Sequence, residues 1–521
     1  MKMDRDRLFL IMKVLIMGLL PLMACILTCL CQGGSLFDVS ILSSEWNDEI
    51  LYYKQVESVL SHGFPQGFFG YNESHARVLS FASWSPVLYL PWTLFGLVFG
   101  WSLASPVIAN LLFLSAALIL YTLLVKPRWD QMIFLILGFA FYRSLTRYAM
   151  SATPEIICHA IVIIFCALAI TYQKDEKKGK VILMFVLSMF ATLMRPYLIL
   201  FMLLPAWFCA RKYKWKGCVL SAGLFGISLL LYALIGKYLQ AAYLSPLFST
   251  EFLHAGVGGI FRTLFAKTGE FFRQTFEFRH NGLARGAAYI AYGVTFLILV
   301  VQCASDIVKL RGYAKSEEGE NASQLKRELP LRIFLVFSYL AMFAALILMY
   351  PYEQGSRHVL LFVTAGAFAI QTFQDKWYVK RDIVILCFLL TFFVRASDPY
   401  EYGIPFKDST EQAKLSYWQE AFEGGVVLES QNVPCYDNTM IWLFNDQVEG
   451  KTVAGDWHAL YALPKGMGIS LVTSDFAKEH FDELQSRYLL VPQGGTIDEA
   501  CDAAGFRVIG EHEGAIVYAR Y

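Results

Sequence analysis

Long apolar blocks separated by short polar segments make up the chain as far as residue 397. The first two blocks each hold about twenty apolar residues, which is the length that a helix needs to cross a hydrocarbon layer of about 30 Å. The whole pattern predicts about eleven membrane-spanning helices. Their expected ranges are 8–31, 103–125, 131–149, 154–172, 180–194, 196–210, 217–237, 285–305, 331–350, 358–374 and 382–397.

The composition agrees with a membrane protein. Of the 521 residues, 56% are hydrophobic and only 17% are charged, whereas soluble domains are about 25% charged. The net charge of +1 excludes a polybasic nucleic-acid binder. The eleven cysteines lie mostly inside the apolar blocks and include no CxxC pair, so a zinc or redox site has little support.

Positive charge in the loops orients the predicted helices, because cytoplasmic loops are rich in Lys and Arg. With the N-terminus in the cytoplasm, every inner loop is basic, and an odd number of spans leaves the C-terminus outside. The cations of these inner loops are Lys126, Arg128, Lys174, Lys177, Lys178, Lys180, Arg211, Lys212, Lys214, Lys216, Lys309, Arg311, Lys315, Lys326, Arg327, Lys376, Lys380 and Arg381.

Three pieces are then expected outside: a first loop over 32–102, a second over 238–284, and a domain over 398–521. The segment 85–100 is apolar but holds two prolines, so we expect an interfacial or re-entrant piece there. The transmembrane domain thus covers 1–397. We predict an all-α polytopic membrane protein with a small extracytoplasmic α/β domain at its C-terminus.

Alternating runs support the α/β assignment of the last domain. The runs 487–491 and 508–517 predict strands, and 497–504 predicts a short helix that ends at Gly505. Cys435 and Cys501 are the cysteines of this domain. In an exported compartment they either pair or remain two free thiols.

The first outer loop holds the strongest candidate for chemistry. Asp48 and Glu49 open an expected helix, and Tyr52 shares a helix face with Asp48. A carboxylate beside aromatic residues at a membrane surface suits a general base. The alternative is that both acids simply begin a surface helix, where the helix dipole favours negative charge.

A second pair lies at the start of the predicted fourth span. Pro154 and Glu155 open this helix, and His159 follows one turn deeper on the same face. Ionisable residues at such depth are costly and usually face a protein interior or a wet cavity. A functional pair and a plain polar contact between helices are both compatible with this pattern.

Basic residues on the outer side form the third feature. Arg262 and Arg273 lie off a stripe of phenylalanines at helical spacing, which predicts a helix in the interface with its basic side toward headgroups. Arg195 and Arg357 each stand alone at the mouth of a span, where a guanidinium can hold a phosphate through two hydrogen bonds. General attraction to anionic lipid is the alternative for several of these cations. The outer cations are Arg143, Arg147, Arg195, Arg262, Lys267, Arg273, Arg279 and Arg357.

These elements, in this order, resemble the C-type integral-membrane glycosyltransferases, in particular the protein O-mannosyltransferase and aminoarabinose-transferase group. The matching elements are the Asp48-Glu49 pair in a long first outer loop, the Trp84-Ser85-Pro86-Val87-Leu88-Tyr89 stretch ending in Phe99-Gly100, Pro154-Glu155, and the Arg357-His358 step, where His replaces the more usual Tyr.

The resemblance implies a polyprenyl-phosphate sugar donor, with Asp48 as the base and the outer arginines on the lipid phosphate. It implies an inverting transfer to a hydroxyl of a cell-envelope glycan, lipid or protein, without a cofactor, although a divalent cation is not excluded. Glu49 would assist Asp48, and Glu155, His159 and Tyr52 would contact the acceptor or support the site. A sugar on a phosphate leaves easily, so one base suffices, whereas a glycosidase needs a second carboxylate as acid.

Two other functions use similar parts. A transporter or flippase of lipid-linked saccharides would show an internal repeat and broken helices near the middle of the membrane. The sequence contains no evident repeat, and its ionisable residues gather toward the outer surface. A polymerase that joins lipid-linked chains is the other alternative.

The predicted orientation can be tested by labelling. A cysteine in place of Lys178 should resist a membrane-impermeant thiol reagent in intact cells, because its loop is expected in the cytoplasm. A cysteine in place of Asp408 should react. The unsubstituted chain gives the background from its eleven cysteines. The reverse pattern would overturn the outward placement of every candidate site residue.

Overall fold

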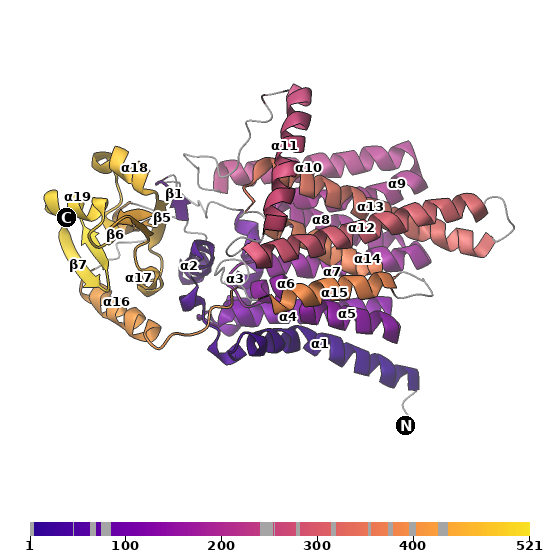
Figure 1. Cartoon of the computed structure of the whole chain (residues 1–521), viewed down its shortest axis with the longest axis horizontal. Coiled ribbons are helices and arrows are strands. Elements are labelled where there is room, and N and C mark those ends of the chain that lie inside the picture. The colour runs from indigo at the N-terminus through magenta and orange to yellow at the C-terminus, as the bar shows by residue number, and fades with distance from the viewer. Residues whose placement is uncertain are drawn as a thin grey trace.

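The computed structural model describes residues 5–44, 46–62, 69–73, 85–239, 254, 256–277, 282–313, 319–352, 356–372, 379–394, 403–425 and 436–520. A bundle of helices occupies most of the molecule, and an α/β domain sits at one end of it (Figure 1). The N-terminal helix begins at the end of the bundle that lies opposite the C-terminus. This arrangement agrees with the predicted division into a membrane part and a C-terminal domain.

Six helices among the described residues are long and apolar enough to cross a membrane. They belong to α1 (Arg5–Cys31), α4 (Ser105–Val125), α7 (Glu155–Asp175), α10 (Trp215–Leu239), α12 (Gly282–Tyr313) and α13 (Gly319–Met349). Shorter helices complete the bundle: α5 (Trp129–Phe141), α6 (Arg143–Ala149), α8 (Lys178–Met194), α9 (Leu203–Tyr213), α14 (Ser356–Ile370) and α15 (Val379–Phe393). Each predicted apolar block therefore contains helix, while the count of eleven spans stays a prediction.

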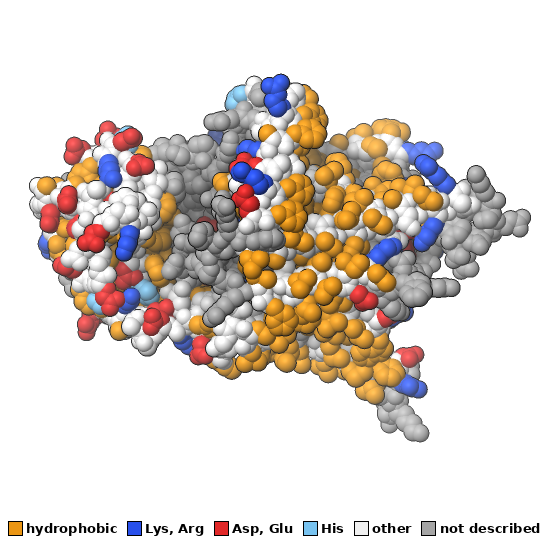
Figure 2. All heavy atoms as spheres, in the orientation of Figure 1, with side chains coloured by type: hydrophobic (Ala, Val, Ile, Leu, Met, Phe, Trp, Pro, Cys, Tyr) orange, Lys and Arg blue, Asp and Glu red, His pale blue; other side chains and the backbone are white. Residues whose placement is uncertain are grey.

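The bundle buries its central helices, α7 among them, and exposes the apolar sides of others. Helix α7 is apolar around most of its surface and is buried along nearly its whole length, as expected for a central helix. Peripheral helices instead present leucines outward, among them Leu15, Leu19 and Leu230. Figure 2 shows hydrophobic side chains covering the visible side of the bundle, with charged side chains at its two ends and on the α/β domain. This is the surface of a multi-pass membrane protein.

Two predicted helices are interrupted. The block 131–149 breaks at Tyr142, whose ψ of 75° is not helical, so that α6 starts in a new direction. The block 196–210 begins as a 3-10 helix, η4 (Pro196–Met202). A proline disfavours the α conformation in the residue before it, and Arg195, directly before Pro196, is extended. Arg143 and Arg147 on α6 are buried in protein, so general attraction to lipid headgroups does not account for these two of the outer cations.

The predicted interfacial piece at 85–100 consists of η3 (Pro86–Leu88) and α3 (Leu90–Phe99). Ten residues of helix are too short to span a bilayer, which needs about twenty. Trp92 anchors the helix, since its indole nitrogen lies 3.0 Å from Oδ1 of Asn110 on α4. Trp84, at the start of the family-like stretch, lies outside the described residues.

The phenylalanine stripe falls on α11 (Gly256–Glu277), as predicted. Phe261, Phe265, Phe272 and Phe276 are all more than half exposed. The helix runs across the direction of the bundle helices (Figure 1), and its apolar side forms one continuous stripe (Figure 2). An amphipathic helix in this orientation suits a position in the membrane interface.

The α/β domain contains a six-stranded sheet in the order β1-β5-β2-β6-β8-β7. The strands are β1 (Phe69–Tyr71), β2 (Thr439–Leu443), β5 (Gly468–Val472), β6 (Tyr488–Pro492), β7 (Arg507–His512) and β8 (Ala515–Ala519), and β3 (Asp446–Val448) pairs separately with β4 (Lys451–Val453). Its helices are α16 (Glu411–Gly425), α17 (Trp457–Ala462), α18 (Ser474–Glu479) and α19 (Thr496–Ala503). The predicted strands and the helix before Gly505 are confirmed. Cys501 is buried, and Cys435 lies outside the described residues.

The first outer loop supplies strand β1 of this sheet, which the sequence pattern did not predict. β1 pairs in parallel with β5. Directly after it, Oδ1 of Asn72 accepts a hydrogen bond from the amide of Thr473 at 3.1 Å. The Glu73 carboxylate accepts from the amides of Gln485 and Ser486 at 3.0 and 2.9 Å. The α/β domain is therefore completed by a segment that precedes it by several hundred residues.

Candidate functional site

Helix α2 (Asn47–His62) carries the candidate base and lies between the bundle and the α/β domain (Figure 1). Its first turn holds Asp48 and Glu49, where acidic residues are favoured by the helix dipole. Ile50 and Val56 are fully buried and fix the helix against its neighbours. Because Asp48 and Glu49 are adjacent on a helix, their side chains point about 100° apart.

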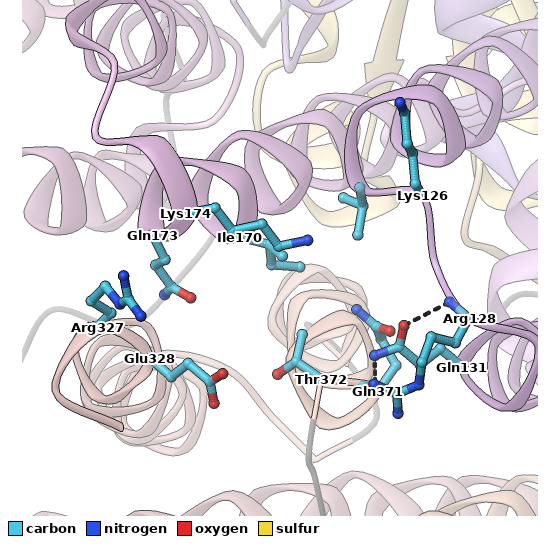
Figure 3. Close-up of a pocket in the computed structure, with 11 residues that line it drawn as sticks. Lys126, Arg128, Gln131, Ile170, Gln173, Lys174, Arg327, Glu328, Gln371 and Thr372 are labelled. Atoms are coloured by element: carbon cyan, nitrogen blue, oxygen red, sulfur yellow. Dashed lines mark hydrogen bonds between the residues drawn. The ribbon is translucent and has the colours of Figure 1, made fainter. Parts of the chain in front are cut away.

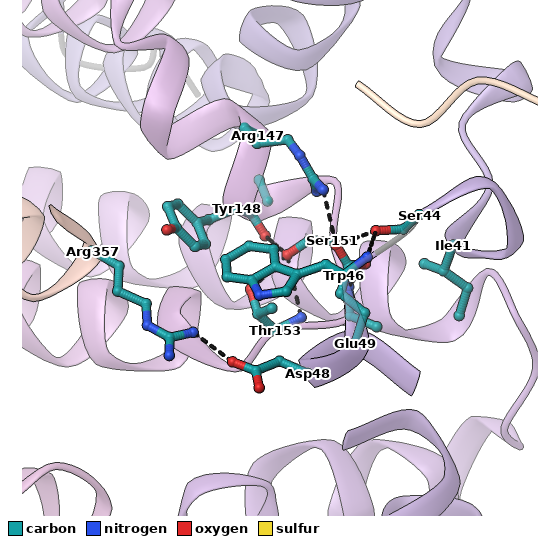
Figure 4. A network of polar contacts seen from close by, with 12 residues as sticks. Ile41, Ser44, Trp46, Asp48, Glu49, Arg147, Tyr148, Ser151, Thr153 and Arg357 are labelled. Atoms are coloured by element: carbon teal, nitrogen blue, oxygen red, sulfur yellow. Dashed lines mark hydrogen bonds and ion pairs between the residues drawn. The ribbon is translucent and has the colours of Figure 1, made fainter. Parts of the chain in front are cut away.

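Asp48 faces α14 and is paired with Arg357. Nη1 of Arg357 donates to Oδ2 of Asp48 at 2.7 Å, and the two side chains are 14% and 16% exposed. The Arg357 guanidinium also lies 5.5 Å from the centre of the Trp46 ring, within cation–π distance. Figure 4 shows this pair beside the Trp46 indole. The sequence separated these two residues by 309 positions, and the fold joins them.

A second ion pair extends the cluster. Nη2 of Arg195 donates to Oε1 of Glu155 at 2.5 Å, and the same oxygen lies 3.9 Å from Nη1 of Arg357. Both Glu155 and Arg195 are almost fully buried. Two carboxylates and two guanidiniums from four separate segments thus form one cluster, with Arg357 between the two acids. We call Asp48, Glu155, Arg195 and Arg357 the charged cluster.

Glu49 has a different environment. Its carboxylate accepts from Nη2 of Arg147 at 2.9 Å, from the Ser44 hydroxyl at 2.9 Å and from the amide of Ala152 at 2.8 Å. Both Glu49 and Arg147 have fully buried side chains. With both oxygens occupied and no solvent access, Glu49 is placed to fasten α2 to the bundle, which favours a structural role over the predicted assistance to Asp48.

Tyr52 follows Asp48 by one helical turn and borders the charged cluster. It is 1% exposed, and its hydroxyl has no hydrogen-bond partner among the described residues. Burial raises the pKa of the Tyr52 phenol; Arg195 and Arg357 act in the opposite direction, whereas Asp48 and Glu155 reinforce the rise. The phenol is therefore neutral and lies near charges of both signs, and its predicted supporting role stays a prediction.

The histidines lie behind the cluster. His159 is fully buried, and its Nδ1 lies 3.0 Å from the Thr364 hydroxyl on α14. His358 lies 3.1 Å from the Tyr197 hydroxyl through its own Nδ1 and packs against the Tyr197 ring at 5.0 Å. These contacts join α7, α14 and η4, so both histidines hold the helices that carry the charged residues.

Arg262 and Arg273 do not join the charged cluster. Both are exposed on α11, and the ion pairs of Arg273 are with Glu270 and Glu277 of the same helix at 3.9 and 3.7 Å. A role for them in binding lipid phosphate stays a prediction. Tyr197 is a site residue to which the sequence reasoning gave no role, and its position two residues after Arg195 was the available signal.

The described residues contain no group of three or more His, Cys, Asp or Glu placed to hold a metal ion. In the charged cluster, guanidinium groups face the carboxylates instead.

The apolar helices and the buried charged cluster at one end of the bundle define a multi-pass membrane protein with a polar site beside an α/β domain. No family model matches the chain, and no curated protein matches it. Two solved structures are similar: ArnT from Cupriavidus metallidurans in the apo state and ArnT from the same organism bound to undecaprenyl phosphate. Each has a TM-score of 0.41 and 10% sequence identity, with 98% of this chain and 98% of that chain covered. Because identity and TM-score are low, the roles assigned below rest on this chain's own residues.

The buried position of Glu49 predicts a loss of stability on substitution. Glu49→Gln leaves Arg147 as a buried charge without its carboxylate, which should cost about 3–5 kcal/mol in the free energy of unfolding. Thermal unfolding in detergent would measure this as a lowered Tm. The matched control, Glu479→Gln, changes a side chain that is 78% exposed and should leave Tm unchanged. An unaltered Tm for Glu49→Gln, with transfer activity lost, would favour a catalytic role for Glu49.

Proposed function

We propose that this protein is a membrane glycosyltransferase that moves a sugar from a polyprenyl-phosphate donor to an acceptor hydroxyl. The observation that carries the proposal is the convergence of three separately predicted residues, Asp48, Glu155 and Arg357, through one guanidinium. Such a cluster offers both chemical parts that the reaction requires: an anion that can accept a proton and cations that can receive a phosphate.

Arg357 is the expected contact for the donor phosphate. Its ion pairs with Asp48 and Glu155 use the same nitrogen, Nη1, so Nε and Nη2 form a second edge of the guanidinium for a phosphate. A planar guanidinium suits two parallel hydrogen bonds to phosphate oxygens. Arg195 adds a second positive charge behind Glu155. Together they would stabilise the charge that develops on the departing lipid phosphate.

Asp48 is the expected base. The acceptor hydroxyl attacks the anomeric carbon from the face opposite the phosphate, and its proton passes to the Asp48 carboxylate. The bond between the anomeric carbon and the phosphate oxygen breaks with its electron pair retained by the phosphate. The configuration at the sugar carbon is inverted, and no general acid is needed because the leaving phosphate is already a weak base.

The proposal places the charged cluster on the outer face of the cell membrane, with the N-terminus in the cytoplasm and the C-terminus outside. The basic loops at the opposite end of the bundle support this orientation. The acceptor is then a glycan, lipid or protein of the cell envelope. The α/β domain lies on the same side as Asp48, where an acceptor would approach.

Asp48→Asn should abolish most of the transfer. The amide keeps the size of the side chain and cannot accept the proton, so turnover should fall by about 10²–10⁴-fold. The assay is sugar transfer from a labelled polyprenyl-phosphate donor in nanodiscs, with donor binding measured separately and expected to persist. Asp38→Asn is the matched control, because Asp38 lies exposed in the same outer loop. Near wild-type turnover of Asp48→Asn would exclude Asp48 as the base. Movement of the donor across the bilayer of sealed proteoliposomes without transfer would favour a flippase.

Arg357→Ala should weaken the donor complex. Loss of a charged hydrogen-bond donor costs about 1.5–3 kcal/mol, which corresponds to an increase of about 10–100-fold in the apparent KM for the donor. Arg357→Lys should restore only part of the affinity, since a lysine lacks the planar fork. Arg507→Ala, on an exposed part of β7, is the control. An equal effect of Arg262→Ala would point instead to general attraction between basic residues and headgroups.

A further inference from the structure

A second polar cavity lies at the end of the bundle away from the α/β domain. Its volume is about 410 Å³, and it is formed by the ends of α4, α5, α7, α13 and α14. Ligand pockets in proteins range over about 300–1,000 Å³, so the cavity is large enough for a small headgroup. Figure 3 shows Lys174 extending from α7 into the space between Gln173 and the Gln371–Thr372 end of α14. None of the residues that line this cavity belongs to the charged cluster.

The lining is strongly positive. Lys126, Arg128, Lys174 and Arg327 contribute four cations, and Glu328 contributes the one carboxylate of the lining. Some of this charge is balanced locally, since Arg128 pairs with Asp130 at 2.9 Å and Glu328 accepts from Arg332 at 2.6 Å.

Lys174 and Arg327 form no ion pair within the described part of the chain. Two cations from different helices, α7 and α13, therefore border a shared space in which Glu328 is the one carboxylate of the lining. Such an arrangement costs electrostatic repulsion and attracts an anion.

Two amide groups of the lining are incompletely satisfied. Nε2 of Gln371 donates to the Tyr121 hydroxyl at 2.6 Å, while its Oε1 is buried and has no hydrogen-bond partner among the described residues. Nε2 of Gln173 is likewise buried without a described partner. A buried polar atom without a partner costs about 1–3 kcal/mol. Both side chains line the cavity, so a bound group could supply a donor for Gln371 and an acceptor for Gln173.

We propose that this cavity binds a phosphate group that carries a neighbouring hydroxyl. Lys174 and Arg327 hold the phosphate charge, Gln173 donates to a phosphate oxygen, and Oε1 of Gln371 accepts from the hydroxyl. A glycerol-phosphate headgroup of an anionic lipid and a soluble phosphate compound share this chemistry. Basic pockets between membrane helices commonly hold anionic headgroups. The site is separate from the proposed transferase chemistry and does not depend on it.

The test compares the wild-type chain with the double variant Lys174→Gln and Arg327→Gln in nanodiscs. The probe is phosphatidylglycerol added to phosphatidylcholine, and native mass spectrometry counts the retained anionic lipid. Each cation near anionic lipid contributes a few-fold in affinity, so the double variant should bind about tenfold or more weakly. Lys178→Gln with Lys212→Gln is the matched control. It removes the same charge at two exposed residues outside the cavity.

Two further measurements distinguish a lipid headgroup from a soluble phosphate compound and control for misfolding. Inorganic phosphate added to phosphatidylcholine nanodiscs should raise the Tm of the wild type and not of the double variant if the ligand is soluble. Retention of phosphatidylglycerol without a phosphate effect identifies a lipid. Lys174→Arg with native Arg327 keeps both charges and should retain the probe. The proposal fails if the double variant and its matched control lose equal amounts of lipid and respond equally to phosphate.

Discussion

The buried ion pair between Glu49 and Arg147 is the interaction on which the site depends. Two charges removed from water carry a large desolvation cost, which is offset only when their remaining hydrogen bonds are satisfied. Here the Ser44 hydroxyl and the Ala152 amide donate the remaining hydrogen bonds to the Glu49 carboxylate. The pair fixes the rotation of α2 about its own axis. Because Asp48 lies one residue earlier on the same helix, fixing Glu49 against α6 also directs Asp48 toward Arg357.

The α/β domain holds α2 from its other side. The buried ammonium of Lys54 donates to the carbonyl of Leu463 at 2.7 Å, and the Tyr53 ring packs against Tyr461 at 5.5 Å. The indole of Trp457 donates to the carbonyl of Leu42 at 2.7 Å, just before the helix. The domain thus contacts the chain before, along and after α2, because β1 also enters its sheet. A displacement of this domain would move Asp48 relative to Arg357, so the α/β domain has a direct mechanical connection to the charged cluster.

The sequence predicted the parts of this structure that depend on local pattern. Apolar blocks identified the helices, because a membrane span must be apolar along its length. Acidic residues at the starts of predicted helices identified Asp48 and Glu155, and isolated cations at the mouths of spans identified Arg195 and Arg357. The breaks in 131–149 and 196–210 were less accessible, since the first depends on where Arg147 finds a partner 98 positions away. Strand β1 has only three residues and forms by pairing with β5, so no local sequence pattern predicts it. The sequence could not predict that Asp48 and Glu49 have different environments, because their partners, Arg357 and Arg147, are distant in the sequence.

The pairing of Asp48 with Arg357 has a consequence for the order of events. Without donor, the proposed base and the proposed phosphate contact neutralise one another at 2.7 Å. A phosphate that binds Arg357 brings a second anion to the same guanidinium and competes with Asp48 for it. The carboxylate then has one less cationic partner at the moment when the sugar arrives. Glu155 keeps its ion pair with Arg195 during this exchange, because that pair does not involve Asp48. One guanidinium would in this way couple the arrival of a donor phosphate to the release of the proposed base.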